Sequence, residues 1–140
     1  MTSQTISKIL TPNDIGETGG HQAGMCIPKE KDILDFFPRL DSHIKNPRET
    51  IVLKTEDGKY MNLSFIYYNG KFFGGTRNEY RLTGMTKYFR ENALSSGDII
   101  FLSKDEAGNY SLAFKKSAKQ LDSIVITSTK WKSIKLHGGN

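Results

Sequence analysis

Short apolar runs separated by glycine, proline and asparagine recur along the chain, and they predict a sheet of short strands. Apolar and polar residues alternate over residues 61–68, so one face of that strand is expected to enter the core. Its apolar positions are Met61, Leu63, Phe65 and Tyr67. The preceding Glu56-Asp57-Gly58 predicts a hairpin with residues 51–53, and Asn69-Gly70 predicts another turn.

The other apolar runs predict further strands, with helices only over short segments. The strand candidates are residues 7–10, 25–27, 99–102, 110–114 and 124–126, with a second hairpin turn at residues 105–109. One helix is predicted to begin at Thr11, with Asp14 completing a capping box and Gly16 ending it; two more are expected over residues 29–37 and 85–92. The pattern favours a mainly β fold of about seven strands with short helices, arranged as a barrel or an open, barrel-like sheet.

Composition and charge narrow the class of protein. Residues 1–140 are expected to form one domain. Their net charge of +5 suits a polyanionic partner, and residues 104–140 contribute seven lysines against three acids. No stretch approaches the length of a membrane span and the first residues lack a secretory pattern, so a cytoplasmic location is expected. The single Cys26 excludes an internal disulfide, and its apolar neighbours predict a small buried residue. Trp131 is expected to anchor the last segment.

The segment Thr76-Arg77-Asn78-Glu79-Tyr80-Arg81 is the first candidate for chemistry. In an extended chain Arg77, Glu79 and Arg81 project from one side, with Asn78 on the other. Arginine pairs in bidentate fashion with guanine, and glutamate accepts from the amino group of cytosine, so this side suits the reading of a major groove. The alternative is a solvated strand on which Glu79 pairs with its arginine neighbours.

A glycine-rich loop is the second candidate. Thr18, Gly19, Gly20, His21, Gln22, Ala23 and Gly24 follow one another, so the backbone can approach a ligand closely and present His21 and Gln22. A phosphate-cradling loop is a weaker reading because the glycine spacing fits no nucleotide-binding motif and the loop has no basic residue. The alternative without a binding role is a flexible turn with an exposed histidine.

Catalytic readings find less support. Three scattered histidines and one cysteine give no paired spacing for a metal site. Asp57 and Lys59 fit the short carboxylate–x–lysine pattern of a magnesium-dependent nuclease, but Asp57-Gly58 is sufficiently explained as a turn. A compact nuclease using these two residues is therefore kept as the competing enzyme hypothesis.

Two ordered motifs carry a family resemblance. Ser7 to Gly24, closed by Ile27-Pro28-Lys29, resembles the opening of the N-terminal effector domain of EcoRII-type restriction endonucleases. Gly75 to Thr83 resembles the second DNA-reading element of the same family, and Gly97-Asp98 with the following strand resembles its late hairpin. The likeness extends from Ser7 to about Phe114, and Tyr80 stands at a position that can be basic in relatives.

The resemblance implies a DNA-binding pseudobarrel, a fold shared with plant DNA-binding domains. In this fold two arms hold the major groove of the target duplex, and the enzyme is expected to be bacterial. The N-arm would lie around Thr18 to Lys29 and the C-arm would lie over Arg77 to Arg81. The DNA-binding residues it implies are Thr18, Gly20, His21, Gln22, Lys29, Arg77, Asn78, Glu79, Tyr80 and Arg81, with Lys87 as a phosphate contact.

Members of this family read the duplex CCWGG, where W is A or T, as an effector or targeting site, while a separate nuclease domain cuts with magnesium. The chain itself is therefore expected to need no cofactor and to have no catalytic residue. It would be part of a longer type II restriction enzyme, or a stand-alone binder whose nuclease is a separate chain. A protein-interaction module whose arms hold a peptide is the third reading.

Overall fold

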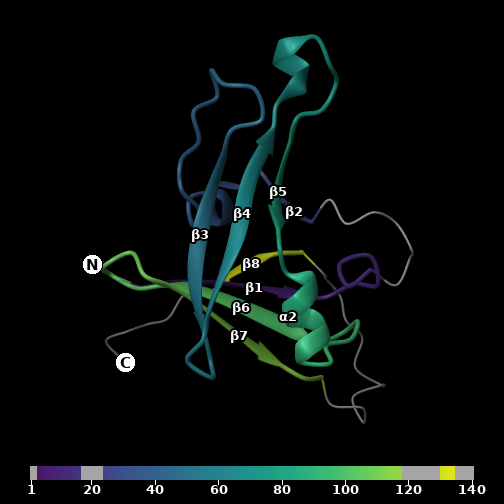
Figure 1. Cartoon of the computed structure of the whole chain (residues 1–140), viewed down its shortest axis with the longest axis vertical. Helices are drawn as coiled ribbons and strands as arrows, with labels where there is room; N and C mark the ends of the chain where they lie inside the picture. The colour runs from purple at the N-terminus through teal and green to yellow at the C-terminus, as the bar shows by residue number, and fades with distance from the viewer. Residues whose placement is uncertain (1–2, 17–23, 118–129, 135–140) are drawn as a thin grey trace.

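The structure, a computed structural model, describes residues 3–16, 24–117 and 130–134, which form one coiled sheet with three short helices (Figure 1). The strands in the described ranges, in their order across the sheet, are β2 (Met25–Ile27), β5 (Glu79–Thr83), β4 (Tyr60–Tyr68), β3 (Arg48–Thr55), β7 (Tyr110–Lys115), β6 (Ile99–Lys104), β1 (Gln4–Ile9) and β8 (Lys132–Ile134). The helices are α1 (Lys31–Leu34), the 3-10 helix η1 (Gly70–Phe73) and α2 (Thr86–Glu91). All paired strands are antiparallel except β3 and β7.

The sheet curls into a half-barrel around its core. In Figure 1 the strands β3, β4 and β5 run along the long axis and cross the group formed by β1, β6 and β7. The ring of Phe65 is fully buried between these groups, as are Leu82 and Leu102. At the open side, the Trp131 Nε1–H donates to the carbonyl of Cys26 over 3.0 Å and so ties the segment before β8 to β2, the other edge of the sheet. The mainly β barrel-like fold and the anchoring role of Trp131 are confirmed.

The two predicted hairpins are present. Thr55 N–H donates to the Lys59 carbonyl over 2.7 Å, which closes the turn between β3 and β4. Asp105 N–H donates to the Asn109 carbonyl over 3.0 Å and closes the turn between β6 and β7. The predicted inward face of β4 is confirmed, since Leu63, Phe65 and Tyr67 are buried and Met61 packs partly against the core. Strict alternation ends at Ile66, which is buried as well.

Several predicted elements differ in the structure. Thr11 and Asp14 do make the reciprocal bonds of a capping box, over 2.9 and 3.2 Å, but the segment ends after a single turn at Gly16 and forms no helix. The helix predicted over residues 29–37 contracts to α1, because residues 36 and 37 continue in tighter i→i−3 turns that carry their rings into the core.

Two further corrections concern the edges of the sheet. Cys26 is exposed rather than buried, because its neighbours Met25 and Ile27 take the inward positions of a three-residue strand. The strand predicted at residues 124–126 lies outside the described residues, while β8 was not predicted. Of the described helices, none is long and apolar enough to cross a membrane.

Candidate nucleic-acid interface

Two arginines and a glutamate form a charged row that leads into β5. The Glu79 carboxylate accepts hydrogen bonds from Arg77 at 2.5 and 3.0 Å and from Arg81 at 3.2 Å. The bond from Arg77 lowers the pKa of the Glu79 carboxyl and, with the bond from Arg81, outweighs the rise that partial burial causes. The three side chains therefore share one face, as alternation predicts, and Glu79 stays ionised between its two cations.

The row is extended across the sheet by an aromatic ring. The Arg77 guanidinium lies 3.9 Å from the centre of the Tyr68 ring, and Tyr68 pairs directly with Glu79 across β4 and β5. Stacking of this kind orients the guanidinium plane while its N–H groups remain able to donate. Tyr68 was not singled out from the sequence, because its partnership with Arg77 depends on the strand register rather than on sequence spacing.

The intervening residues Asn78 and Tyr80 occupy the other face of the C-arm. Tyr80 stacks on Tyr67 with ring centres 4.2 Å apart and on Phe65 at 5.6 Å. Burial raises the pKa of the Tyr80 hydroxyl. The Tyr67 hydroxyl donates to Asn78 Oδ1 over 2.6 Å. Both residues thus support the C-arm from the core side, while Arg77, Glu79 and Arg81 lie on the opposite face, where exposure falls from Arg77 to the largely buried Arg81.

The end of the N-arm meets the C-arm at Arg81. The Arg81 Nη1 donates to the carbonyl of Gly24 over 2.9 Å, and Gly24 directly precedes β2. The same guanidinium bonds Glu79, so one side chain joins the two arms. Its Nε–H is buried and has no hydrogen-bond partner among the residues that the structure describes.

The turn that precedes the N-arm is fixed separately. Lys8 Nζ lies 2.5 Å from Asp14 Oδ2 in an ion pair whose two side chains are only 10% and 9% exposed. The capping-box bonds between Thr11 and Asp14 hold the same turn. The predicted contacts Thr18, Gly20, His21 and Gln22 lie outside the described residues, between this turn and Gly24.

The C-arm is anchored by a fully buried asparagine, Asn69. Its Oδ1 accepts from the Asn46 N–H over 2.7 Å, and its Nδ2 donates to the carbonyls of Ile44 and Ser42 over 2.9 and 3.3 Å. The sequence predicted only a turn at this residue. The amide instead ties the loop of residues 41–47 to the end of β4, at the base of the hairpin that leads to the C-arm.

Replacing Asn69 by alanine is expected to lower the free energy of unfolding by about 2–3 kcal/mol, because it removes three hydrogen bonds made by a fully buried amide. Urea unfolding monitored by circular dichroism measures the change. Asn62→Ala, at an exposed position of the strand β4 that Asn69 follows, is the matched control and should change stability little. Equal effects of the two substitutions would contradict the anchoring role of Asn69.

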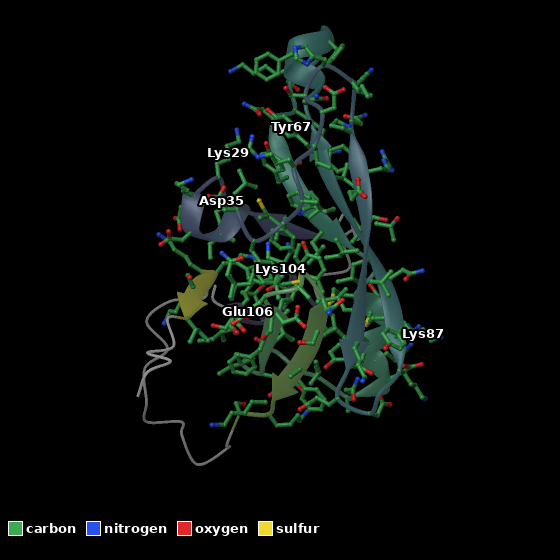
Figure 2. All side chains as sticks on the ribbon, turned by 90° about the vertical axis from the view of Figure 1, so that its left-hand side faces the viewer. Lys29, Asp35, Tyr67, Lys87, Lys104 and Glu106 are labelled. Carbon is green, nitrogen blue, oxygen red and sulfur yellow. The ribbon has the colours of Figure 1, made fainter. Side chains whose placement is uncertain are left out.

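The remaining predicted contacts, Lys29 and Lys87, lie apart. Both are exposed; Lys29 follows β2, whereas Lys87 lies on α2 with its Nζ 3.8 Å from a carboxylate oxygen of Glu91. Figure 2 shows the two lysines on opposite sides of the molecule. The structure therefore brings Arg77, Glu79 and Arg81 together with the end of the N-arm, but it does not bring Lys87 to that group.

The Asp57 and Lys59 pair, which the competing nuclease hypothesis uses, belongs to the turn between β3 and β4. The Asp57 carboxylate accepts from the Thr55 hydroxyl and from the Lys59 N–H, the latter over 3.3 Å, while the Lys59 ammonium is 4.0 Å away in an exposed ion pair. The bond from Thr55, helped by that from Lys59, lowers the Asp57 pKa. Within the described ranges, no group of three or more histidine, cysteine, aspartate or glutamate residues is placed to hold a metal ion.

Comparison with known proteins places this arrangement in a family. The model of the family described as restriction endonuclease EcoRII, N-terminal, matches residues 2–119. The chain belongs to this EcoRII N-terminal family. The type II restriction enzyme EcoRII of Escherichia coli is 38% identical to it over 80 residues, which cover 54% of this chain and 19% of that enzyme. The match thus spans about a fifth of the enzyme's length.

Solved structures share the fold. The B3 domain of the UbaLAI restriction endonuclease, a triple mutant solved with its cognate DNA, superposes with a TM-score of 0.65 at 17% identity, covering 94% of this chain and 86% of that one. FUS3 of Arabidopsis, solved as a DNA complex, gives a TM-score of 0.61 at 21% identity over 80% of this chain and 96% of its own. The EcoRII N-terminal chain therefore has the pseudobarrel fold of B3 domains, as its sequence led us to expect.

Proposed function

We propose that this chain is a sequence-specific double-stranded-DNA-binding domain, which reads a short site in the major groove as the effector or targeting domain of a type II restriction endonuclease. Membership of the EcoRII N-terminal family supports the restriction-enzyme context. Two proteins with the same fold were solved with DNA, which supports a duplex as the ligand.

The observation that carries the proposal is the row of Arg77, Glu79 and Arg81 beside the end of the N-arm. Each guanidinium can donate two parallel bonds to the O6 and N7 of guanine, and the carboxylate can accept from the N4 of cytosine. In the unbound chain Glu79 neutralises part of the arginine charge. Bases that replace these internal bonds must offer the same donors and acceptors, so mismatched bases leave charged groups unpaired.

This chemistry fits a target rich in G·C pairs, and we propose CCWGG or a close variant. The C-arm of Arg77 to Arg81 would read one part of the site. The N-arm, with His21 and Gln22 foremost and Thr18, Gly20 and Lys29 alongside, would read the rest. Asn78 and Tyr80 would act from behind, by holding the C-arm against the core rather than by touching bases.

Cleavage is proposed to lie outside this chain, in a magnesium-dependent nuclease domain of the same polypeptide or of a partner, within a bacterial cytoplasm. The turn geometry of Asp57 accounts for that residue without a catalytic role. Lys87, on α2, would at most touch a phosphate. Its replacement by alanine would then weaken all duplexes about equally, because phosphate contacts carry no base information.

A fluorescence anisotropy titration of labelled duplexes at fixed salt tests the proposal. We expect the chain to bind a CCWGG duplex at least tenfold more tightly than a scrambled duplex of equal length. Arg77→Ala should cost about 1–3 kcal/mol of binding free energy on the CCWGG duplex, the value of one bidentate base contact, and relax the preference at one base pair.

Two results would overturn the assignment. Equal binding of cognate and scrambled duplexes would contradict sequence reading, while binding that does not weaken with salt would favour a peptide as the ligand, since counterion release makes DNA binding fall steeply with salt. Magnesium-dependent cleavage of a plasmid that disappears in Asp57→Ala would favour the compact nuclease instead.

A further inference from the structure

The tip of the hairpin between β4 and β5 carries two adjacent phenylalanines that the fold leaves in solvent. Phe72 is 63% exposed and Phe73 is 42% exposed. Figure 1 shows η1, which contains both residues, at one end of the long axis, beyond the crossing of the strands. A scattered apolar side chain on a surface is ordinary, but two neighbouring aromatic rings on a projecting tip indicate an interaction site.

The tip is held in one conformation by backbone hydrogen bonds. Phe72 N–H donates to the Asn69 carbonyl over 3.0 Å, and Lys71 N–H donates to the Arg77 carbonyl over 2.8 Å. Gly75 N–H closes the turn on the Gly70 carbonyl over 2.7 Å. Because Asn69 is itself fully buried and bonded, the backbone that carries the two rings is preformed, and a partner need not order it first.

The same end of the molecule gathers further apolar surface and positive charge. Ile44, in the loop that Asn69 holds, is 55% exposed, so three of the five exposed large apolar side chains in the described residues belong to the two segments that Asn69 joins. Those segments, residues 41–47 and 69–78, contain three lysines or arginines and a single acid, Asp41. Asp41 in turn accepts bonds from its neighbour, His43.

Two exposed aromatic rings with a net positive surround fit one occupant best, the stacked bases of a DNA duplex. The Lys71 ammonium lies 6.0 Å from the centre of the Phe72 ring and can meet a phosphate while the ring meets a base or sugar. Phe72 and Phe73 offer no hydrogen bond, so they can contribute apolar contact and stacking but no reading of base edges.

We infer that Phe72 and Phe73 form an apolar wedge that enters the base stack at a step flanking the sequence read by the arms. The inference rests on the proposed function. The bond between Lys71 and Arg77 sets two chain segments side by side, about 5 Å apart, and the wedge begins one to two residues beyond Lys71, at about 3.8 Å per residue. The unstacked step is therefore expected within a few base pairs of the one that Arg77 contacts.

Duplexes carrying 2-aminopurine at single positions within and around CCWGG test the wedge, since this adenine analogue fluoresces more strongly when it is unstacked. The full chain is compared with Phe72→Ala/Phe73→Ala, and anisotropy is measured on the same duplexes at several salt concentrations. Tyr60→Ala is the matched control, because Tyr60 is 68% exposed at the opposite end of β4.

We expect fluorescence to rise several-fold at one flanking position with the unaltered chain and with Tyr60→Ala, and to stay low with the double variant. The double variant should bind about tenfold more weakly, as expected for the loss of stacking on a base. Its dependence of log affinity on log salt should be unchanged, because no charge is removed, whereas Lys71→Ala should make that dependence shallower. Its unfolding midpoint should match that of the unaltered chain.

The outcomes separate the wedge from the proposed function. If the unaltered chain prefers CCWGG but no position brightens, or if the double variant binds as tightly, the wedge is wrong and sequence reading stands. If the chain binds no duplex, both are wrong. A change in sedimentation coefficient of the double variant without a change in DNA affinity would assign the rings to pairing of two chains, and would also overturn the wedge.

Discussion

Replacing Arg81 by alanine is expected to remove most of the discrimination between cognate and scrambled duplexes, with a fall of about 1–3 kcal/mol in binding free energy on the cognate site alone. The side chain has two functions to lose. It joins the Gly24 carbonyl to the Glu79 carboxylate in the unbound chain, and in the proposed complex it donates to a guanine. Anisotropy titrations on both duplexes at one salt concentration measure the ratio of affinities.

Two companion variants assign the effect of Arg81→Ala. Arg81→Lys keeps the charge but not the planar pair of donors, so it should restore little of the discrimination and leave the binding to scrambled DNA unchanged. Arg90→Ala removes the same charge from the exposed side of α2 and should leave the affinity ratio unchanged. If Arg90→Ala lowers the ratio as much as Arg81→Ala does, net charge rather than position explains the result, and the assignment of Arg81 is wrong.

Most of the charged row could be predicted because it depends on one extended segment. Alternation places Arg77, Glu79 and Arg81 on one side of any extended chain, and the structure has them there. The same rule put Asn78 on the opposite side, where it accepts from Tyr67. The sequence also left open whether Glu79 pairs with its arginine neighbours, and in the unbound chain it does.

What could not be predicted depends on contacts between distant segments. The stacking of Arg77 on Tyr68 follows from the register of β4 and β5, which no local pattern determines. Asn69 was read as a turn because asparagine before glycine usually marks one; its burial depends on a loop more than twenty residues earlier, which supplies the partners of its amide. Exposed Cys26 illustrates the same limit, since an apolar run of three residues does not show which of its members faces inward.

Gly24→Ala is expected to have the largest effect on stability of the substitutions considered, a loss of about 3 kcal/mol or more in the free energy of unfolding, together with loss of discrimination between duplexes. Gly24 has a φ of +87°, and a Cβ there would lie 2.4 Å from the Leu82 carbonyl oxygen and 2.6 Å from Thr83 Cγ2. The nearest of these atoms is backbone of β5 and cannot turn aside. The strand β2 would have to move off β5, which exposes Met25 and breaks the bond from Arg81.

Gly58→Ala is the control that separates two causes of lost stability at Gly24, the steric clash of an added Cβ and the cost of the left-handed backbone conformation. Gly58 has nearly the same φ, +84°, but a Cβ there meets nothing within 4 Å, so its replacement carries only the cost of a left-handed conformation, about 1–2 kcal/mol. Urea unfolding of both variants gives the difference in their free energies of unfolding. Anisotropy titrations with the CCWGG duplex show whether DNA binding changes as well. Because Gly58 lies at the turn between β3 and β4, Gly58→Ala should preserve discrimination. If the two substitutions destabilise the chain equally, the close approach of β2 to β5 at Gly24 is not what fixes the end of the N-arm.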